Sequence, residues 1–251
     1  LALARADQSV LLMDVNWGTG SLEMLCGLNG RWNFSHALDG THRLDEVLLD
    51  GPARVKILSR VGNLAEAVPS SHTSELWQQL AQLRQEFQFV VIDLGPGMAR
   101  NLPTLMSIVG RVINVTTTEP TSIAEAYATM KSLAGMIQPK WDVLVNQSEQ
   151  LSQAETIFQR LKQTTRVFLK TELGWAGSIP SDTHVTSAVF RRNPFLLEHP
   201  QCEASQAIKH LARRLINQSE SGTYQHSSPS SALMAAIGNR MEDPQPQITA
   251  T

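Results

Sequence analysis

The sequence predicts an α/β fold in which a mostly parallel central sheet carries helices on both faces. Short apolar segments that end in a polar residue alternate with longer segments of helical periodicity, and this alternation is typical of repeated strand and helix units. The composition is that of an ordinary globular chain, with 251 residues of which 42% are apolar and 18% are charged. A chain of this length can form one large core followed by a tail.

Four short apolar segments are predicted to be buried strands. A carboxylate or amide residue follows three of these segments directly, namely Asp14, Asp93 and Asn146, and the fourth segment ends in a threonine run. Ligands of parallel α/β sheets bind at the carboxyl ends of the strands, so we expect these three residues at a ligand-binding edge. The four predicted strands are Val10–Met13, Phe89–Ile92, Val112–Val115 and Val143–Val145.

Two segments between the predicted strands have the periodicity of amphipathic helices. In Ser74–Phe87, apolar residues recur every three or four positions. Ser122–Met136 opens with a serine that is followed three residues later by Glu125, a pattern that predicts a capped helix start at Ser122. These helices are expected to cover the faces of the sheet.

Charge and cysteine content exclude several classes of protein. The formal net charge is −2 at pH 7, so nothing attracts the whole chain to nucleic acid, and we do not expect specific nucleic-acid binding. The two cysteines, Cys26 and Cys202, lie far apart, and no apolar segment approaches the roughly 20 residues that cross a bilayer. We therefore expect a cytoplasmic protein without a disulfide framework.

The composition changes near Asn217 to one rich in Ser, Gln, Pro and Gly, which predicts a flexible polar tail over residues 217–251. Leu233, Met234, Ile237 and Met241 would lie on one face of a short amphipathic helix within this tail. Such a face predicts weak contact with a membrane or a partner protein. The simpler alternative is a disordered tail with incidental apolar residues.

Asp14 and Asp93 are candidates for holding magnesium, since Mg²⁺ binds through one or two carboxylates and water. Either aspartate alone could instead cap a helix or a turn. Glycines follow both residues, and Gly18, Gly95 and Gly97 would let loops rearrange or approach a phosphate closely. The alternative for these glycines is ordinary tight turns.

Several segments in this order resemble the MinD/ParA-type ATPases. Leu11–Leu28 resembles their second strand and first switch, and Val90–Gly97 resembles their magnesium-proximal strand and second switch. Val115–Tyr127, with its Thr-Glu-Pro-Thr sequence, is similar to the branch that counts and places bacterial flagella (FlhG/FleN-like). Gly177–Asp182 is similar to the family's late loop over the base, and the resemblance covers about Leu1 to Leu215.

The resemblance implies an ATP-dependent molecular switch with Mg²⁺ that forms a homodimer when ATP is bound, in a MinD-like domain over residues 1–216. It implies a protein partner in flagellar or other positioning machinery. A peripheral location on the inner face of the cell membrane would follow from the tail. Asp14 and Asn16 would be catalytic and Asp93 and Asp14 would hold the metal, while the nucleotide contacts would be Gly18, Gly95, Gly97, Asn146, Pro180 and Asp182.

Two departures from the family pattern affect the predicted activity. The Gly-rich phosphate-binding loop with its Gly-Lys-Thr is absent from these residues, and the resemblance places it directly upstream of Leu1. We therefore expect a chain without its first strand and its phosphate-binding loop, which would leave unpaired strand edges in the sheet. Asn16 stands where the family usually has a second aspartate. The alternative function is a MinD-like binding module that does not hydrolyse ATP.

Other chemistries on this scaffold are not expected. Cys26 and Cys202 do not form a plausible iron–sulfur ligand pair, and the histidines, His184 among them, have no metal-ligand spacing such as His-x-x-x-His. Glu119 is expected to position a loop rather than to act as a base. Late basic residues could bind DNA non-specifically, although a solvated helix face explains them better; these are Arg191, Arg192, Lys209, Arg213 and Arg214.

Overall fold

The computed structural model describes residues 1–14, 21–59, 79, 82–83, 85–94, 109–134 and 140–220. Asn16, Gly18, Gly95 and Gly97 fall outside these residues, as does the tail from residue 221 with its predicted amphipathic face. Most of the predicted helix Ser74–Phe87 also falls outside, and its described residues at 79, 82–83 and 85 are helical.

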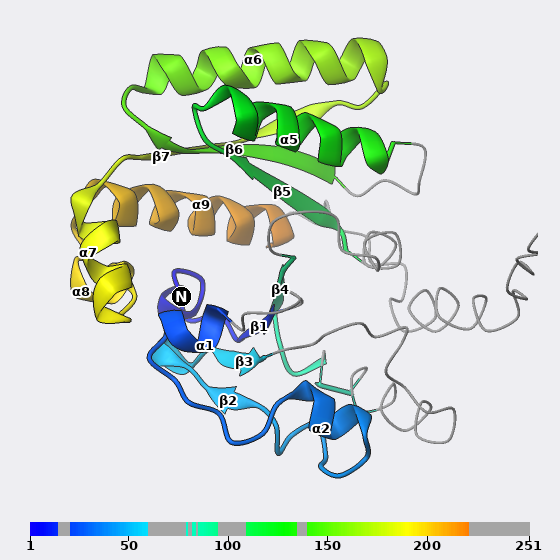
Figure 1. Cartoon of the computed structure of the whole chain (residues 1–251), viewed down its shortest axis with the longest axis vertical. Coiled ribbons are helices and arrows are strands. Elements are labelled where there is room, and N and C mark those ends of the chain that lie inside the picture. Colours follow the sequence, from blue (N-terminus) through cyan, green and yellow to red (C-terminus); the bar gives the residue numbers. More distant parts are fainter. Residues whose placement is uncertain are drawn as a thin grey trace, which may run out of the picture.

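The described strands form two sheets (Figure 1). In the first sheet the order is β2-β3-β1-β4, and β1 pairs in parallel with both β3 and β4, while β2 is antiparallel to β3. In the second sheet the order is β5-β6-β7, and all pairs are parallel. The strand bounds are β1 Val10–Asp14, β2 Leu49–Asp50, β3 Lys56–Leu58, β4 Phe89–Asp93, β5 Arg111–Thr116, β6 Lys140–Ser148 and β7 Leu173–Pro180.

The predicted fold class is confirmed, with one difference in the sheet. Six of the seven described strands are parallel to a neighbour, and each of the four predicted strands coincides with an observed one. The sequence predicted one central sheet, whereas the described strands divide into two, with β4 at an edge of the first and β5 at an edge of the second.

Helices lie on both faces of the second sheet (Figure 1). α5 and α6 cover one face through a core that includes Met130, Leu133, Ile157 and Phe158 against Val143. α9 packs against the other face. The helices are α1 Ser21–Leu25, α2 Phe34–Leu38, α5 Pro120–Ser132, α6 Leu151–Phe168, α7 Thr183–Arg191, α8 Phe195–Glu198 and α9 Glu203–Glu220, with short 3₁₀ turns η1 at Ala4–Ala6 and η2 at Pro52–Arg54.

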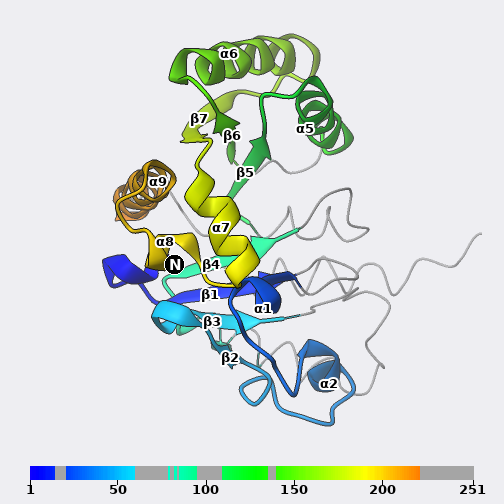
Figure 2. The same cartoon turned by 60° about the vertical axis from the view of Figure 1, so that its left-hand side comes forward.

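α9 contacts both sheets with different parts of one apolar face. Its first half, with Ala204 and Leu211, packs against Leu144 and Ala176 of the second sheet. Its second half, with Ala212, belongs to a core beneath the first sheet that includes η1 and β1. Figure 2 shows α9 between the end of the chain labelled N and the second sheet. This helix therefore links the two sheets through apolar packing.

α5 begins earlier than the sequence predicts, and the predicted serine cap is wrong. The helix starts at Pro120, and Glu119 is the N-cap residue without a side-chain capping bond. Proline suits this first position because its missing N–H has no partner in a first helical turn. The Ser122 hydroxyl instead accepts a hydrogen bond from the Thr117 amide at 2.9 Å, which closes the turn between β5 and α5.

α9 also extends past the predicted end of the domain. It continues through Asn217 to Glu220, so the first four residues of the predicted 217–251 tail are helical. Among the residues that the structure describes, no helix combines the length and the apolar character needed to span a bilayer.

Candidate functional site

Asp14 and Asp93 are the last residues of two neighbouring parallel strands, as the sequence predicts. β1 and β4 are paired with Asp14 directly opposite Asp93. Residues in register on adjacent strands point to the same face, and adjacent strands lie about 4.8 Å apart. Asp14 is fully buried and Asp93 is half-buried. Two carboxylates are therefore placed side by side at the carboxyl edge of the first sheet.

Ser59 extends this row on the other side of Asp14. Leu58 pairs with Met13, so Ser59 follows β3 at the level where Asp14 follows Met13. Its hydroxyl is fully buried and has no hydrogen-bond partner among the described residues. The sequence reasoning missed Ser59 because β3 is only three residues long and lies behind Gly51 and Pro52.

The chemistry of this row fits a hard divalent cation. Two carboxylates and a buried hydroxyl provide oxygen ligands, which Mg²⁺ prefers, and a cation would relieve the repulsion between the two carboxylates. Asp14 also accepts a hydrogen bond from the Leu22 amide at the start of α1, with 3.4 Å between N and Oδ2. Asp14 therefore directly precedes the segment that contains Asn16 and Gly18, and it is hydrogen-bonded to Leu22 just beyond the other end of that segment.

Asn146 and Pro180 come together near the carboxyl edge of the second sheet. The β6–β7 register shifts between Val145 and Ser148, and Gln147 has a positive φ of 56° in this irregular stretch. Beyond the shift, Ser148 pairs with Pro180. The Asn146 side chain is half-buried at this end of the sheet.

Asp182 has a structural role that the sequence does not predict. As the N-cap of α7 it accepts a hydrogen bond from the His184 amide, and its other oxygen accepts one from the Ala204 amide in the first turn of α9. Burial disfavours the charged carboxylate, but hydrogen bonds from the Cys202 thiol, these two amides and the His184 ring outweigh it and hold the pKa of Asp182 well below its usual value. One charged side chain thus caps two helices.

The late basic residues make contacts within the chain. Arg191 pairs with Glu198 at 2.7 Å, the Arg214 guanidinium donates to the carbonyl of Ala176, and Lys209 donates to the carbonyl of Pro200. These contacts hold three of the five basic side chains against the chain itself, and the preference for a helix face over a DNA-binding surface stays a prediction. Glu119 is exposed; its amide donates to the Thr117 hydroxyl at 3.2 Å, and its carbonyl accepts the Ile123 amide at 3.1 Å.

Comparison with solved structures identifies the fold. A MinC:MinD cell division protein complex from Aquifex aeolicus matches with a TM-score of 0.66 at 22% identity, over 86% of this chain and 86% of that chain. The septum site-determining protein MinD complexed with Mg-ADP from Pyrococcus horikoshii OT3 matches with the same TM-score at 18% identity, over 85% of this chain and 86% of that one. The fold is therefore that of the MinD/ParA-type proteins.

Sequence relatives indicate which members of this class of proteins the chain is similar to. The chain is 29% identical to the antiactivator FleN of Pseudomonas aeruginosa over 86% of its own length and 78% of that protein. It is 23% identical to the flagellum site-determining protein YlxH of Helicobacter pylori, over 88% and 76% of the two chains. No family model matches the chain. The predicted relationship to MinD/ParA-type ATPases close to FleN and FlhG is thus confirmed.

The structure brings the predicted site residues into two groups. Asp14 and Asp93 share the edge of the first sheet, while Asn146, Pro180 and Asp182 lie at the end of the second. Sequence reasoning missed Ser59, and it also missed the neighbours of Asp182. The histidine spacing showed no metal-ligand pattern, and the fold brings Asp182 together with His184 and Cys202, a neighbourhood that the sequence does not indicate.

Proposed function

We propose that this chain is an ATP-dependent dimerising switch that controls the placement or number of a cell structure, and that flagella are this structure. The observation that supports it most is the in-register pair of Asp14 and Asp93 beside the buried hydroxyl of Ser59. Similarity to FleN, YlxH and MinD proteins supports the biological role, since YlxH is named for the flagellum and MinD for the septum.

Asp93 and Asp14 would hold Mg²⁺, in part through water, because Mg²⁺ keeps most of its octahedral water shell. When bound, the ion neutralises charge on the transferred phosphate. Gly18, Gly95 and Gly97 would let their loops close on the nucleotide, since glycine adopts backbone conformations closed to other residues. Closure of these loops is what would couple ATP to dimer formation.

Asn146 and Pro180 would contact the base. The half-buried Asn146 amide can both donate and accept hydrogen bonds, and the edges of an adenine ring require both. Asp182 would act indirectly, because its oxygens already accept the His184 and Ala204 amides and so hold the turn between β7 and α7 in place.

Asn16 would orient the attacking water, but an amide cannot accept its proton as a carboxylate can. This residue supports a second candidate function, a MinD-like binding module that occupies a partner without hydrolysing ATP. These residues do not contain the family's Gly-rich phosphate-binding loop, and tight ATP binding in either candidate requires such a loop in front of Leu1. In both candidates the protein is cytoplasmic and acts on a partner in the positioning machinery, with the tail adding weak membrane contact.

Equilibrium binding of a fluorescent ATP analogue with and without Mg²⁺ tests the proposal. Binding is expected to be clear and magnesium-dependent in a chain that carries a phosphate-binding loop in front of Leu1, and weak in residues 1–251 alone. Asp93→Asn should remove the magnesium dependence. Asp45→Asn is the matched control, because Asp45 is an exposed carboxylate whose ion pair among the described residues is with the equally exposed Arg43. Equal magnesium dependence in both variants, or equal binding by both chains, would contradict the proposal.

A further inference from the structure

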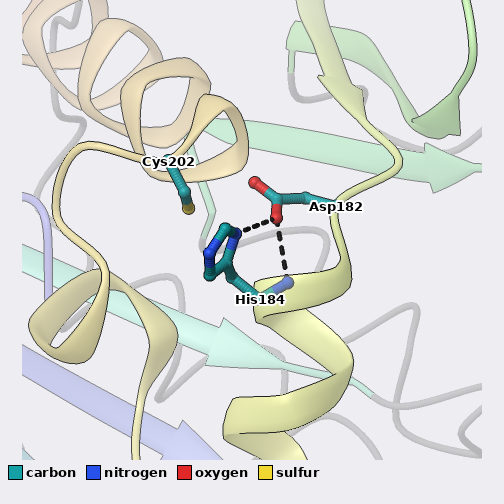
Figure 3. A group of neighbouring side chains, drawn as sticks. All are labelled: Asp182, His184 and Cys202. Carbon is teal, nitrogen blue, oxygen red and sulfur yellow. Dashed lines mark hydrogen bonds and ion pairs between the residues drawn. The ribbon is translucent and has the colours of Figure 1, made fainter.

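A carboxylate, an imidazole and a thiol meet where α7 and α9 begin (Figure 3). Asp182 and His184 belong to the start of α7, and Cys202 directly precedes α9. One ligand atom of each residue lies within 4.8 Å of the other two. Cys202 lies 18 or more positions along the chain from the neighbouring Asp182 and His184, so the fold brings the three residues together.

We propose that Asp182, His184 and Cys202 form a binding site for one zinc-class divalent ion. Thiolate sulfur, imidazole nitrogen and carboxylate oxygen are the three protein ligands that zinc uses, and a site with three of them leaves a fourth position for water. Ligand atoms around a tetrahedral zinc ion lie about 3–4 Å apart. The ligand atoms of this cluster all lie within 4.8 Å of one another, which is close to that range.

Asp182 is held in an orientation suited to a ligand. Amides of His184 and Ala204 donate to its two oxygens at 2.9 and 3.2 Å, and the His184 ring nitrogen Nδ1 lies 2.8 Å from Oδ1. A carboxylate offers about four acceptor positions, so an ion can share these oxygens with the amides. Hydrogen bonds of this kind fix the direction of metal-binding side chains in known sites.

His184 and Cys202 are accessible and adjustable. The His184 side chain is about half exposed, at 51%, and its ring lies against that of His199, with 4.4 Å between centroids and the planes tilted by 50°. The Cys202 thiol is hydrogen-bonded to the Ser205 hydroxyl at 3.3 Å, and it is not in a disulfide. An ion can therefore enter from the side of His184 and replace the proton of the thiol, which metal binding releases.

Helix capping alone explains only part of this cluster. It accounts for the position of the Asp182 carboxylate between two helix starts, but not for a thiol and an imidazole beside it. The chain has only two cysteines and seven histidines. An ion at this site would join the start of α7 to the start of α9 and so fix the segment between residues 182 and 202. That segment follows Pro180, one of the predicted nucleotide contacts.

Titration of the reduced chain with Co²⁺ and Zn²⁺ tests the site directly. We expect one equivalent of Co²⁺ to produce the near-ultraviolet absorption band of a cobalt–thiolate bond, and one equivalent of Zn²⁺ to abolish that band by displacement. Zn²⁺ should also raise the thermal unfolding midpoint. Cys202→Ser should remove the band and His184→Gln should weaken Zn²⁺ binding at least about tenfold.

Cys26→Ser is the matched control, because Cys26 is the other free cysteine and lies outside the cluster. It should retain the full band. Serine at position 202 keeps the shape of the side chain and can still hydrogen-bond Ser205, and the unfolding midpoint without metal checks that each variant is folded. The proposal is overturned if no band appears, or if the band persists in folded Cys202→Ser, or if it is lost only in Cys26→Ser.

Discussion

Gly174 is expected to be required for a buried ion pair near the amino ends of the strands of the second sheet. It lies on β7 directly opposite Asp142 of β6, and a Cβ at this position would lie 1.9 Å from the Asp142 carboxylate oxygen Oδ1. Asp142 pairs with Arg111 of β5 at 2.6 Å, and the two side chains are only 5% and 9% exposed. Gly174→Ala therefore forces the carboxylate away from its partner.

The expected cost follows from the burial of this pair. Breaking a buried ion pair costs about 3–5 kcal/mol, because a charge is left without compensation, so we expect Gly174→Ala to lower the free energy of unfolding by about 3 kcal/mol. Urea unfolding followed by tryptophan fluorescence measures this free energy, since Trp141 and Trp175 lie in the core of this sheet.

A double-mutant cycle separates this explanation from a general intolerance of alanine in β7. In the background Arg111→Met with Asp142→Ala, the added methyl group meets no carboxylate, and its cost should fall below about 1 kcal/mol. The reasoning is refuted if Gly174→Ala costs less than about 1 kcal/mol in the natural background, or the same in both backgrounds.

Three further predictions concern other residues. Asp182→Asn should lower the free energy of unfolding at neutral pH, because the pKa of Asp182 is lower in the folded than in the unfolded chain. The difference from the natural chain should shrink as the pH falls below about 4, and unfolding curves at several pH values measure it. Asn16→Asp in the upstream-extended chain should raise single-turnover hydrolysis at least about tenfold with unchanged ATP affinity, and an unchanged rate would remove Asn16 from the mechanism. Deleting residues 233–241 should reduce co-sedimentation of the ATP-bound dimer with liposomes, and the membrane contact is wrong if neither form sediments.

The strands that the sequence predicts share one property, an apolar run that ends in a polar residue. β1, β4 and β5 match their predicted runs to within a residue at each end, whereas β6 extends from Lys140 to Ser148 on both sides of its apolar centre. β7 was missed because Gly174, Gly177 and Pro180 weaken its strand signal. β2 and β3 were missed because two or three residues show no periodicity.

The parts of the site that could not be predicted depend on contacts between distant segments. Asp14 and Asp93 were predictable because each ends its own strand, but their direct register requires the pairing of β1 with β4. Ser59 and Cys202 have no local signal, since each depends on where a neighbouring strand or helix lies. The packing of α9 against the cores of both sheets is likewise a contact between distant segments without a local sequence signal.

The central claim, an ATP switch anchored by the strand-end aspartates, is tested most directly by sedimentation velocity of the upstream-extended chain with ATP and Mg²⁺. The natural protein should sediment as a dimer with ATP and Mg²⁺ and as a monomer when Mg²⁺ is removed. Asp93→Ala should remain monomeric in both conditions with an unchanged fold, since a half-buried strand-end carboxylate contributes less to stability than to holding the ion. A dimer of normal strength in the Asp93→Ala variant would contradict the account.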